Sequence, residues 1–393
     1  MRKWLTRWFF GKKHPPVRPL HSPLKRELVR AARLNRMDKE RPYPMASMTL
    51  ADQSLTAEIR RRTHAANQNN VTRTKAYLDF FRRHPEVHWA LLAHLVSRNG
   101  GWNMTDLKGE WLPRMMKQEE REAFFLFLER SNWLIFHDAY AQLLLYEEMK
   151  QTRADLTRLL PLLGVSRFMV PVWQDFLHRQ DSVLLTRALI INEQQYIEQR
   201  VVRQPFFREN VLSTFEFLAQ SVLSLSQVLF PYKHHATDKR LRVTGVVVHD
   251  FPSVAHRIEI GKALYGILYG DRERFRNILE WASRIPHTGS RSDYWPHLFT
   301  PVKQETDEQV YQERIRGMEL IQGRPKVYSP RLSAVWADVD HPPADGVDWF
   351  RDERWVEELK HGASLPLLET EMYAKSLNLV ELGLQMYTRL SSD

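Results

Sequence analysis

Two histidines of this 393-residue chain, His84 and His88, lie four residues apart in a segment with a helical pattern. This spacing allows two imidazoles on one helix face to reach one ion, so both are candidate ligands of a divalent metal. The enzyme that such a site indicates is a metal-assisted hydrolase. The alternative is a histidine pair at the start of a helix that is solvated or hydrogen-bonded.

A second set of polar side chains follows in the same segment. His94, Ser97 and Arg98 fall at i, i+3 and i+4, so they share one stripe of a helix. They either line a polar pocket, or they satisfy each other and neighbouring backbone inside a helical core, where polar groups must be hydrogen-bonded. Further candidates for the same pocket are Asn99, Trp102, Asn103, Asn192 and Glu193.

The helix that carries this stripe is predicted to be buried. From Glu86 to Arg98 it is apolar almost all the way round, which is typical of a helix in the middle of a domain. The run Asn99-Gly100-Gly101 is predicted to end it, because Asn and Gly tolerate the left-handed conformation of a C-terminal cap.

Three segments of the chain resemble a known family. The residues HPEVHWALLAHLVSRNGGWNMTDLKG (84–109), INEQQYIEQRV (191–201) and HRIEIGKALYGILYG (256–270) are similar to the YppC-type family of Bacillus-related bacteria, a domain of unknown function. The resemblance covers most of the chain from about Asn67 onward. It implies a bacterial, mostly helical protein, and it carries over no catalytic or binding residues.

The composition is that of an ordinary globular protein, with 43% hydrophobic and 26% charged residues. There is no cysteine, which excludes disulfides, thiolate catalysis and Cys-based metal sites and fits a cytoplasmic location. The net charge of +10 belongs to the N-terminal arm, since residues 1–62 hold 16 Lys/Arg and 5 Asp/Glu while the rest holds 41 and 42. A neutral body argues against nucleic acid as a partner.

Aromatic and basic residues alternate at the N-terminus, which has no secretory signal pattern. Rings and cations together suit a bilayer interface, so peripheral contact with the inner membrane face is predicted. The alternative is a disordered tail. The predicted membrane contacts are Trp4, Trp8, Phe9 and Phe10.

The fold class predicted from these patterns is all-α. It is a multi-helix globular bundle with a buried central helix, a flexible N-terminal arm and at most one short strand or hairpin, for which 241–249 is the candidate. Residues 1–46 are predicted to be the partly disordered arm and linker. Residues 47–393 are predicted to form one large helical domain, loop-rich near 285–362. The segments 210–230 and 305–321 are expected to be helical.

Several standard signatures are absent from the sequence, among them the phosphate-binding glycine loops, the serine nucleophile elbow and H-E-x-x-H. The function that we expect is therefore a non-catalytic binding or scaffold protein that contacts a protein partner or the inner membrane surface. A metal-dependent hydrolase with a His/Asn/Glu pocket around the central helix is the competing prediction. Neither the oligomeric state nor a partner's identity follows from the sequence.

Overall fold

The computed structural model describes residues 20–37, 48–212, 227–233, 238, 240–304 and 310–390. The predicted membrane contacts Trp4, Trp8, Phe9 and Phe10 and most of the predicted arm lie outside these residues. Among the described residues, no helix is long and apolar enough to span a bilayer.

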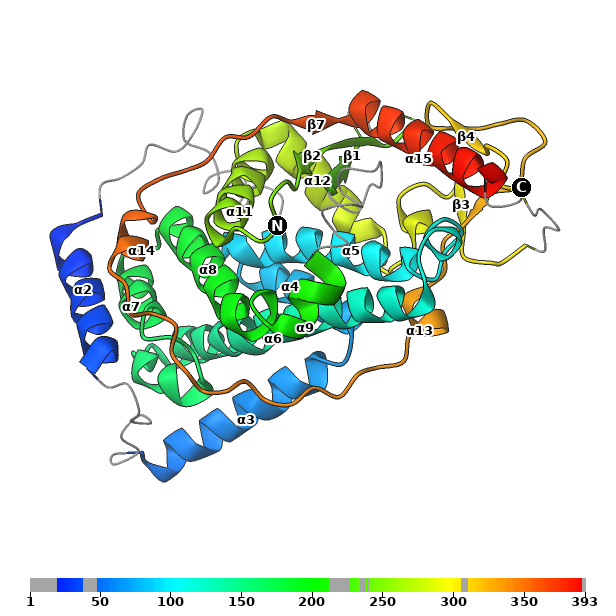
Figure 1. Cartoon of the computed structure of the whole chain (residues 1–393). Helices are drawn as coiled ribbons and strands as arrows, with labels where there is room; N and C mark the ends of the chain where they lie inside the picture. The colour runs from blue at the N-terminus through cyan, green and yellow to red at the C-terminus, as the bar shows by residue number, and fades with distance from the viewer. Residues whose placement is uncertain are drawn as a thin grey trace.

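The described part of the chain is mostly helical (Figure 1). Its α-helices are α2 Ser22–Met37, α3 Leu50–Ala66, α4 Asn70–Arg83, α5 His88–Asp106, α6 Gln118–Thr152, α7 Met169–Arg179, α8 Ser182–Ile197, α9 Pro205–Phe207, α11 Val254–Tyr269, α12 Arg272–Arg284, α13 Leu332–Val335, α14 Arg354–Glu357 and α15 Thr370–Leu390. Shorter 3-10 turns cover Leu112–Arg114, Thr157–Leu159, Pro161–Leu163 and Arg291–Asp293, and π-helical turns cover Glu198–Val202 and Arg208–Leu212.

More strands are present than the sequence predicted, which corrects the limit of one strand or hairpin. The main sheet has the order β1-β2-β7 and is antiparallel, with β1 Gln227–Tyr232, β2 Arg242–Val247 and β7 Leu368–Glu369. Two small two-stranded sheets pair β3 Phe299–Thr300 with β6 Val327–Tyr328, and β4 Ile315–Arg316 with β5 Glu319–Leu320. The predicted strand at 241–249 is confirmed as β2.

Two predicted helices are wrong where these strands lie. Residues 227–230 belong to β1, whose apolar side chains pack in the core when paired with β2 rather than on a helix face. Residues 315–316 and 319–320 form a hairpin around Gly317, which has a φ of 58° and breaks the helical pattern. Both segments carry enough apolar residues for either structure, so periodicity alone did not separate helix from strand.

The predicted buried central helix is α5, which runs between α4, α6, α8 and α11 (Figure 1). It does not end at Asn99-Gly100-Gly101, as predicted, but continues to Asp106. The Asn99 side chain explains part of the difference: its Nδ2 donates to the carbonyl of Leu229 (3.0 Å), and its Oδ1 accepts from the Leu229 N–H (2.9 Å). Asn99 therefore attaches the helix to strand β1 instead of capping it.

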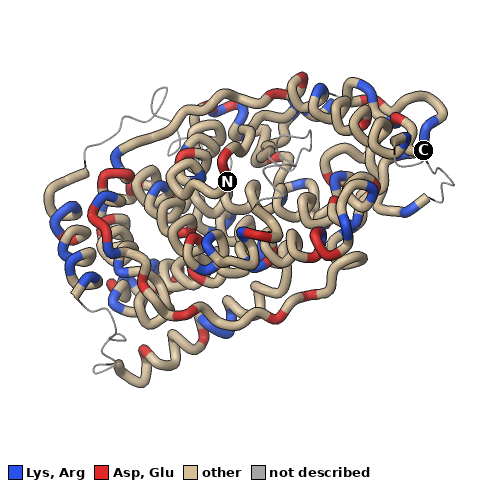
Figure 2. The backbone as a smooth tube through the Cα atoms, in the orientation of Figure 1, with Lys and Arg blue, Asp and Glu red and all other residues tan. Residues whose placement is uncertain are grey.

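Basic residues of α2 lie next to an acidic stretch of the body (Figure 2). Lys25 pairs with Glu357 at 3.0 Å, and Arg33 pairs with Glu353 at 3.3 Å, so the acidic α14 segment faces the basic helix. Beneath these pairs, Leu24 and Leu28 are buried.

Gly101 is required where the side chains of other elements touch the backbone of α5. A Cβ at this position would lie 2.5 Å from both Asn70 Oδ1 and His287 Nε2, whereas a Cβ at Gly100 would meet its neighbours at 3.5 Å or more. The first distance is a clash and the second is ordinary contact. Gly101 thus permits the close approach of His287 to the helix.

We expect Gly101→Ala to lower the free energy of unfolding by about 1–3 kcal/mol, because the neighbours must shift or lose their hydrogen bond. Gly100→Ala, the matched control one residue earlier, should be neutral or stabilise by up to about 1 kcal/mol because Ala favours the helix. Urea unfolding followed by circular dichroism measures both. Equal stability of the two variants would contradict this account of Gly101.

Candidate functional site

The candidate site is organised by the loop of residues 285–293, whose first part is held by α5. Arg98, 1% exposed, donates from Nη1 to the carbonyl of Ile285 (2.8 Å) and from Nη2 to the carbonyl of Pro286 (3.0 Å). Its guanidinium also lies 4.4 Å from the centre of the Trp281 ring. Arg98 therefore fixes the backbone of the loop.

A second buried arginine holds the other end of the loop. The Nε and Nη2 of Arg291 donate to the Asp106 carboxylate at 2.6–3.0 Å, and Nη1 donates to the Tyr373 hydroxyl at 2.7 Å. The Trp102 ring lies 4.8 Å from the same guanidinium. Bidentate pairing of this kind is both strong and directional. The last turn of α5 thus sets the position of the loop's C-terminal half.

His287 projects from this loop toward α4. Its Nε2 donates to Asn70 Oδ1 at 2.7 Å, and Asn70 Nδ2 in turn donates to the carbonyl (2.9 Å) and hydroxyl (3.1 Å) oxygens of Ser97. The Ser97 hydroxyl is 2.6 Å from that of Thr74. A polar chain therefore runs from the loop across α4 to α5.

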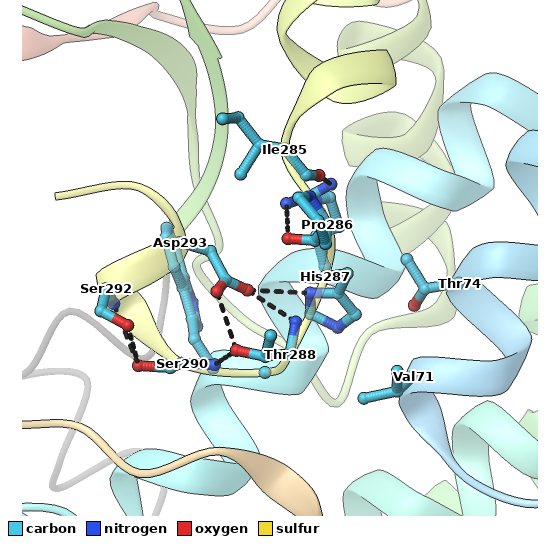
Figure 3. A network of polar contacts seen from close by, with 12 residues as sticks. Val71, Thr74, Ile285, Pro286, His287, Thr288, Ser290, Ser292 and Asp293 are labelled. Carbon is cyan, nitrogen blue, oxygen red and sulfur yellow. Dashed lines mark hydrogen bonds and ion pairs between the residues drawn. The ribbon is translucent and has the colours of Figure 1, made fainter. Parts of the chain in front are cut away.

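Asp293, the acidic residue of this loop, lies beside the imidazole of His287 (Figure 3). Asp293 Oδ2 is 3.7 Å from His287 Nδ1, and the carboxylate also accepts from the Thr288 N–H (2.7 Å) and hydroxyl (2.8 Å). Burial lowers the pKa of His287 to about 4, against the opposing influence of Asp293. The imidazole is therefore neutral at pH 7.

His287 and Thr288 form one wall of a pocket of about 230 Å³. The first turn of α4, the α6 helix and the 331–338 segment form the others. Two lining residues, Phe125 and Trp336, stack with their ring centres 3.9 Å apart. The pocket therefore has an aromatic side next to the polar loop.

Glu129 supplies the buried charge of the pocket. It forms an ion pair with Arg73, and both side chains are no more than 2% exposed. Its Oε1 makes no hydrogen bond with a described residue, and His341 Nε2 is 3.8 Å away. Against the effect of burial, the Arg73 guanidinium lowers the pKa of Glu129, so the carboxylate is charged at neutral pH.

The candidate residues of α5 lie near this pocket but do not line it. His94 Nδ1 is 2.8 Å from the carbonyl oxygen of Thr74, and Ser97 belongs to the polar chain described above. Trp102 stacks on Trp295 at 5.6 Å, and Asn103 is half-buried. The predicted stripe thus positions α4 and the loop through its side chains, and the neighbouring Asn99 positions β1.

Asn192, which is buried, and Glu193, which is half-buried, belong to a separate cluster. Asn192 Nδ2 donates to Asp138 Oδ2 at 2.6 Å, and Trp89 Nε1 donates to Glu193 Oε2 at 3.0 Å. Burial raises the pKa of Asp138 to about 7 and that of Glu193 to about 8. The structure therefore does not bring Asn192 and Glu193 together with the α5 stripe in one pocket.

His84 and His88 also have separate partners. His84 Nε2 is 3.1 Å from Glu147 Oε1, within a cluster of ion pairs at the surface of α6. His88 Nδ1 is 2.8 Å from the Tyr265 hydroxyl, its ring stacks on Tyr269, and burial lowers its pKa to about 3. Within the described ranges, no group of three His, Asp or Glu side chains is arranged to hold a metal ion.

Sequence reasoning missed the polar residues that do line the pocket. His287 lies in HTGSRSD (287–293), a run of small polar residues without periodicity in the predicted loop-rich region. Glu129 lies on a predicted helix, but its burial and its pairing with Arg73 depend on contacts between distant segments. The density of hydroxyl, His, Arg and Asp residues in 287–293 was the one local signal.

The Asp138 and Glu193 carboxyls predict how stability depends on pH. The unfolded chain releases these protons near pH 4, whereas the folded protein keeps them to about pH 7 and 8. Each group therefore lowers the free energy of unfolding as pH rises through this window, by up to about 1.4 kcal/mol per pH unit. Asp138→Asn should gain stability relative to the wild type between pH 5 and 7.

Urea unfolding at several pH values measures the difference in stability between Asp138→Asn and the wild type. The buried histidines contribute with the opposite sign, but they are the same in both proteins and cancel in this difference. Glu273→Gln, a change at an exposed carboxyl, is the control and should follow the wild-type pH dependence. If Asp138→Asn also follows the wild type, the carboxyl is ionised in the folded protein and the account of the cluster fails.

Comparison with known proteins places the chain among proteins without an assigned function. Residues 65–372 match the family described as "Protein of unknown function (DUF2515)". The chain is 37% identical over 302 residues to the uncharacterized protein YppC of Bacillus subtilis, an overlap of 76% of this chain and 84% of that protein. No solved structure matches it. The predicted resemblance is confirmed: the chain belongs to the DUF2515 family, in which YppC of Bacillus subtilis is a relative.

Proposed function

We propose that this chain is a non-catalytic binding protein that takes a small polar molecule into the pocket between α4, α6 and the 285–293 loop. The observation that carries the proposal is the lining of this pocket, which sets the buried carboxylate of Glu129 and the imidazole of His287 beside the Phe125–Trp336 stack.

The pocket also suggests the size and character of the ligand. Its volume of about 230 Å³ lies below the roughly 300–1,000 Å³ of pockets that hold drug-sized molecules. The neutral His287 and the ionised Glu129 offer one polar side, and the Phe125–Trp336 stack offers an apolar one. A small molecule with one donor group and one apolar face fits this arrangement.

We favour binding over metal-dependent hydrolysis because the residues predicted for hydrolysis are used elsewhere. His84 contacts Glu147 and His88 contacts Tyr265, on different helices. Asn192 is bonded to Asp138 in the helical core rather than to the pocket. Each of these side chains has a structural partner in the body of the protein.

Filling the pocket should abolish binding without unfolding the protein. Ala337 lines the pocket and is exposed, so Ala337→Trp places a large side chain in it; Ala334→Trp, an exposed α13 position outside the lining, is the matched control. The measurement is the thermal shift produced by a panel of amino acids, polyamines and nucleosides. We expect at least one compound to raise the melting temperature of the wild type and of Ala334→Trp but not of Ala337→Trp.

Two outcomes would overturn this proposal. One is the absence of any shift in the wild type, with no small molecule enriched from a cell extract by mass spectrometry. The other is an equal shift in all three proteins, which would place the ligand outside the pocket.

A second function, contact with an anionic membrane surface through the N-terminal region, is supported by the outer face of α2. This face combines cations with exposed apolar side chains: Arg26 and Arg30 lie beside Leu34 (46% exposed) and Met37 (83% exposed). Cations with apolar side chains suit the headgroup boundary of a bilayer. The predicted contacts Trp4, Trp8, Phe9 and Phe10 precede this helix in the sequence and lie outside the described residues.

Co-sedimentation with vesicles tests this contact. The full chain should bind vesicles that contain phosphatidylserine, bind less at high salt and leave phosphatidylcholine vesicles unbound. Deletion of residues 1–19 should remove most of the binding, because one short anchor gives only marginal affinity by itself. Unchanged partitioning of the deletion variant would rule out the predicted aromatic anchor.

A further inference from the structure

The C-terminal helix α15 has an apolar face that the described chain leaves uncovered. Its inner face is buried by residues such as Tyr373, Leu377 and Leu384, and the helix lies along the outside of the molecule (Figure 1). The opposite face exposes an apolar stripe, with Met386 at 65% and Leu390 at 77% exposure, which Lys375 and Ser376 interrupt between Met372 and Leu379. The stripe consists of Met372, Leu379, Leu382, Met386, Tyr387 and Leu390.

Gly383 lies in the middle of this stripe. The position is exposed, and a Cβ there would meet no described atom within 4 Å, so nothing in the described chain requires glycine. Glycine inside an exposed helix destabilises it relative to alanine. A gap in a stripe of large side chains is what a second helix needs in order to insert a side chain and approach closely.

The charges at the two ends of the stripe indicate what covers it. Glu371 and Arg389 are 18 residues apart, five helical turns, so they lie on the same flank of α15 at opposite ends. Neither forms an ion pair with another described residue within 4 Å, and both are exposed. An antiparallel copy of the same helix would bring Glu371 of one chain against Arg389 of the other at both ends.

The same pairing also matches the apolar residues. Direct opposition of Glu371 and Arg389 puts the two-fold axis level with Val380. With the axis one residue further along, level with Glu381, Leu379 of one copy lies opposite Gly383 of the other and Met372 lies opposite Leu390, while Glu371 and Arg389 differ in level by only about 3 Å. This is the self-complementary contact that a two-fold dimer requires. An anionic lipid surface would attract Lys375 and Arg389 but repel Glu371, whereas an antiparallel copy pairs Glu371 with Arg389.

We propose that α15 is the dimer contact of this protein, an antiparallel helix pair between two copies of the chain. The pair joins the apolar stripe of each copy around Gly383 and places Glu371 against Arg389 at either end. The interface is separate from the ligand pocket and does not depend on the proposed ligand.

The absence of cysteine from the sequence allows a direct test by engineered disulfides. Met372→Cys and Leu390→Cys chains, each oxidised alone, should not cross-link, because two copies of either residue would lie roughly 27 Å apart in the antiparallel pair. An oxidised mixture of the two should form a disulfide-linked dimer. Adding Leu382→Glu to both chains should remove the cross-link, and Leu50→Glu, at an exposed leucine of α3, should not.

Sedimentation equilibrium of the wild type should give twice the mass of one chain, with Leu382→Glu reduced to a monomer and Leu50→Glu unchanged. Three results would overturn the proposal. The first is a wild type that is monomeric at all concentrations. The second is that each cysteine variant cross-links alone as readily as the mixture does. The third is a monomer in which the thiol of Leu382→Cys becomes reactive only after deletion of residues 1–19. The last would assign the stripe to the N-terminal segment of the same chain.

Discussion

The arrangement of this protein depends on two guanidinium groups that are buried between α5 and the 285–293 loop. Removing an ion from water costs several kcal/mol, so each guanidinium needs partners that replace its hydration. Arg291 meets the carboxylate of Asp106, while Arg98 meets two backbone carbonyls and an aromatic ring. Loss of one partner would leave a buried charge uncompensated. The loop therefore has one position in which both arginines are satisfied.

The same requirement fixes α5 within the body. Its polar side chains face different neighbours: Ser97 faces α4, Asn99 faces β1 and Asp106 faces the loop. A shift of the helix by one residue would separate all of these groups from their partners at once. A helix that is apolar nearly all round has little preference for one rotation, since any side can be buried. The polar residues supply that preference.

Local physics explains which parts of the fold could be predicted. The α3 helix begins at Leu50 because Thr49 and Asp52 form a capping box, a signal contained within four residues of sequence. The β2 strand was predicted because its β-branched run is local as well. By contrast, Asn99 pairs with Leu229, 130 residues away, and its side chain resembles a helix cap in the sequence. Residues whose partners are distant cannot be distinguished from local signals by their spacing.

The candidate site was difficult to predict for a related reason. The residues chosen for their chemistry lie on regular helices, where spacing can be analysed, and those side chains turn out to contact other elements of the body. The pocket takes His287 from a loop without periodicity, and the loop can approach α5 because residue 101 is glycine. Loops are where binding groups are commonly found on a rigid scaffold.

The two polar groups of the pocket, the imidazole of His287 and the carboxylate of Glu129, are held by side chains about one turn apart on α4. Asn70 holds the imidazole of His287, and Arg73 holds the carboxylate of Glu129. These two positions are three residues apart on the same helix, a rise of about 4.5 Å, so the helix backbone sets the separation of the groups that they hold. Because both supporting side chains are buried and hydrogen-bonded, this separation does not depend on a bound molecule. A pocket held in this way is preorganised, so binding of the ligand that we propose would cost less side-chain and loop entropy than in a mobile site.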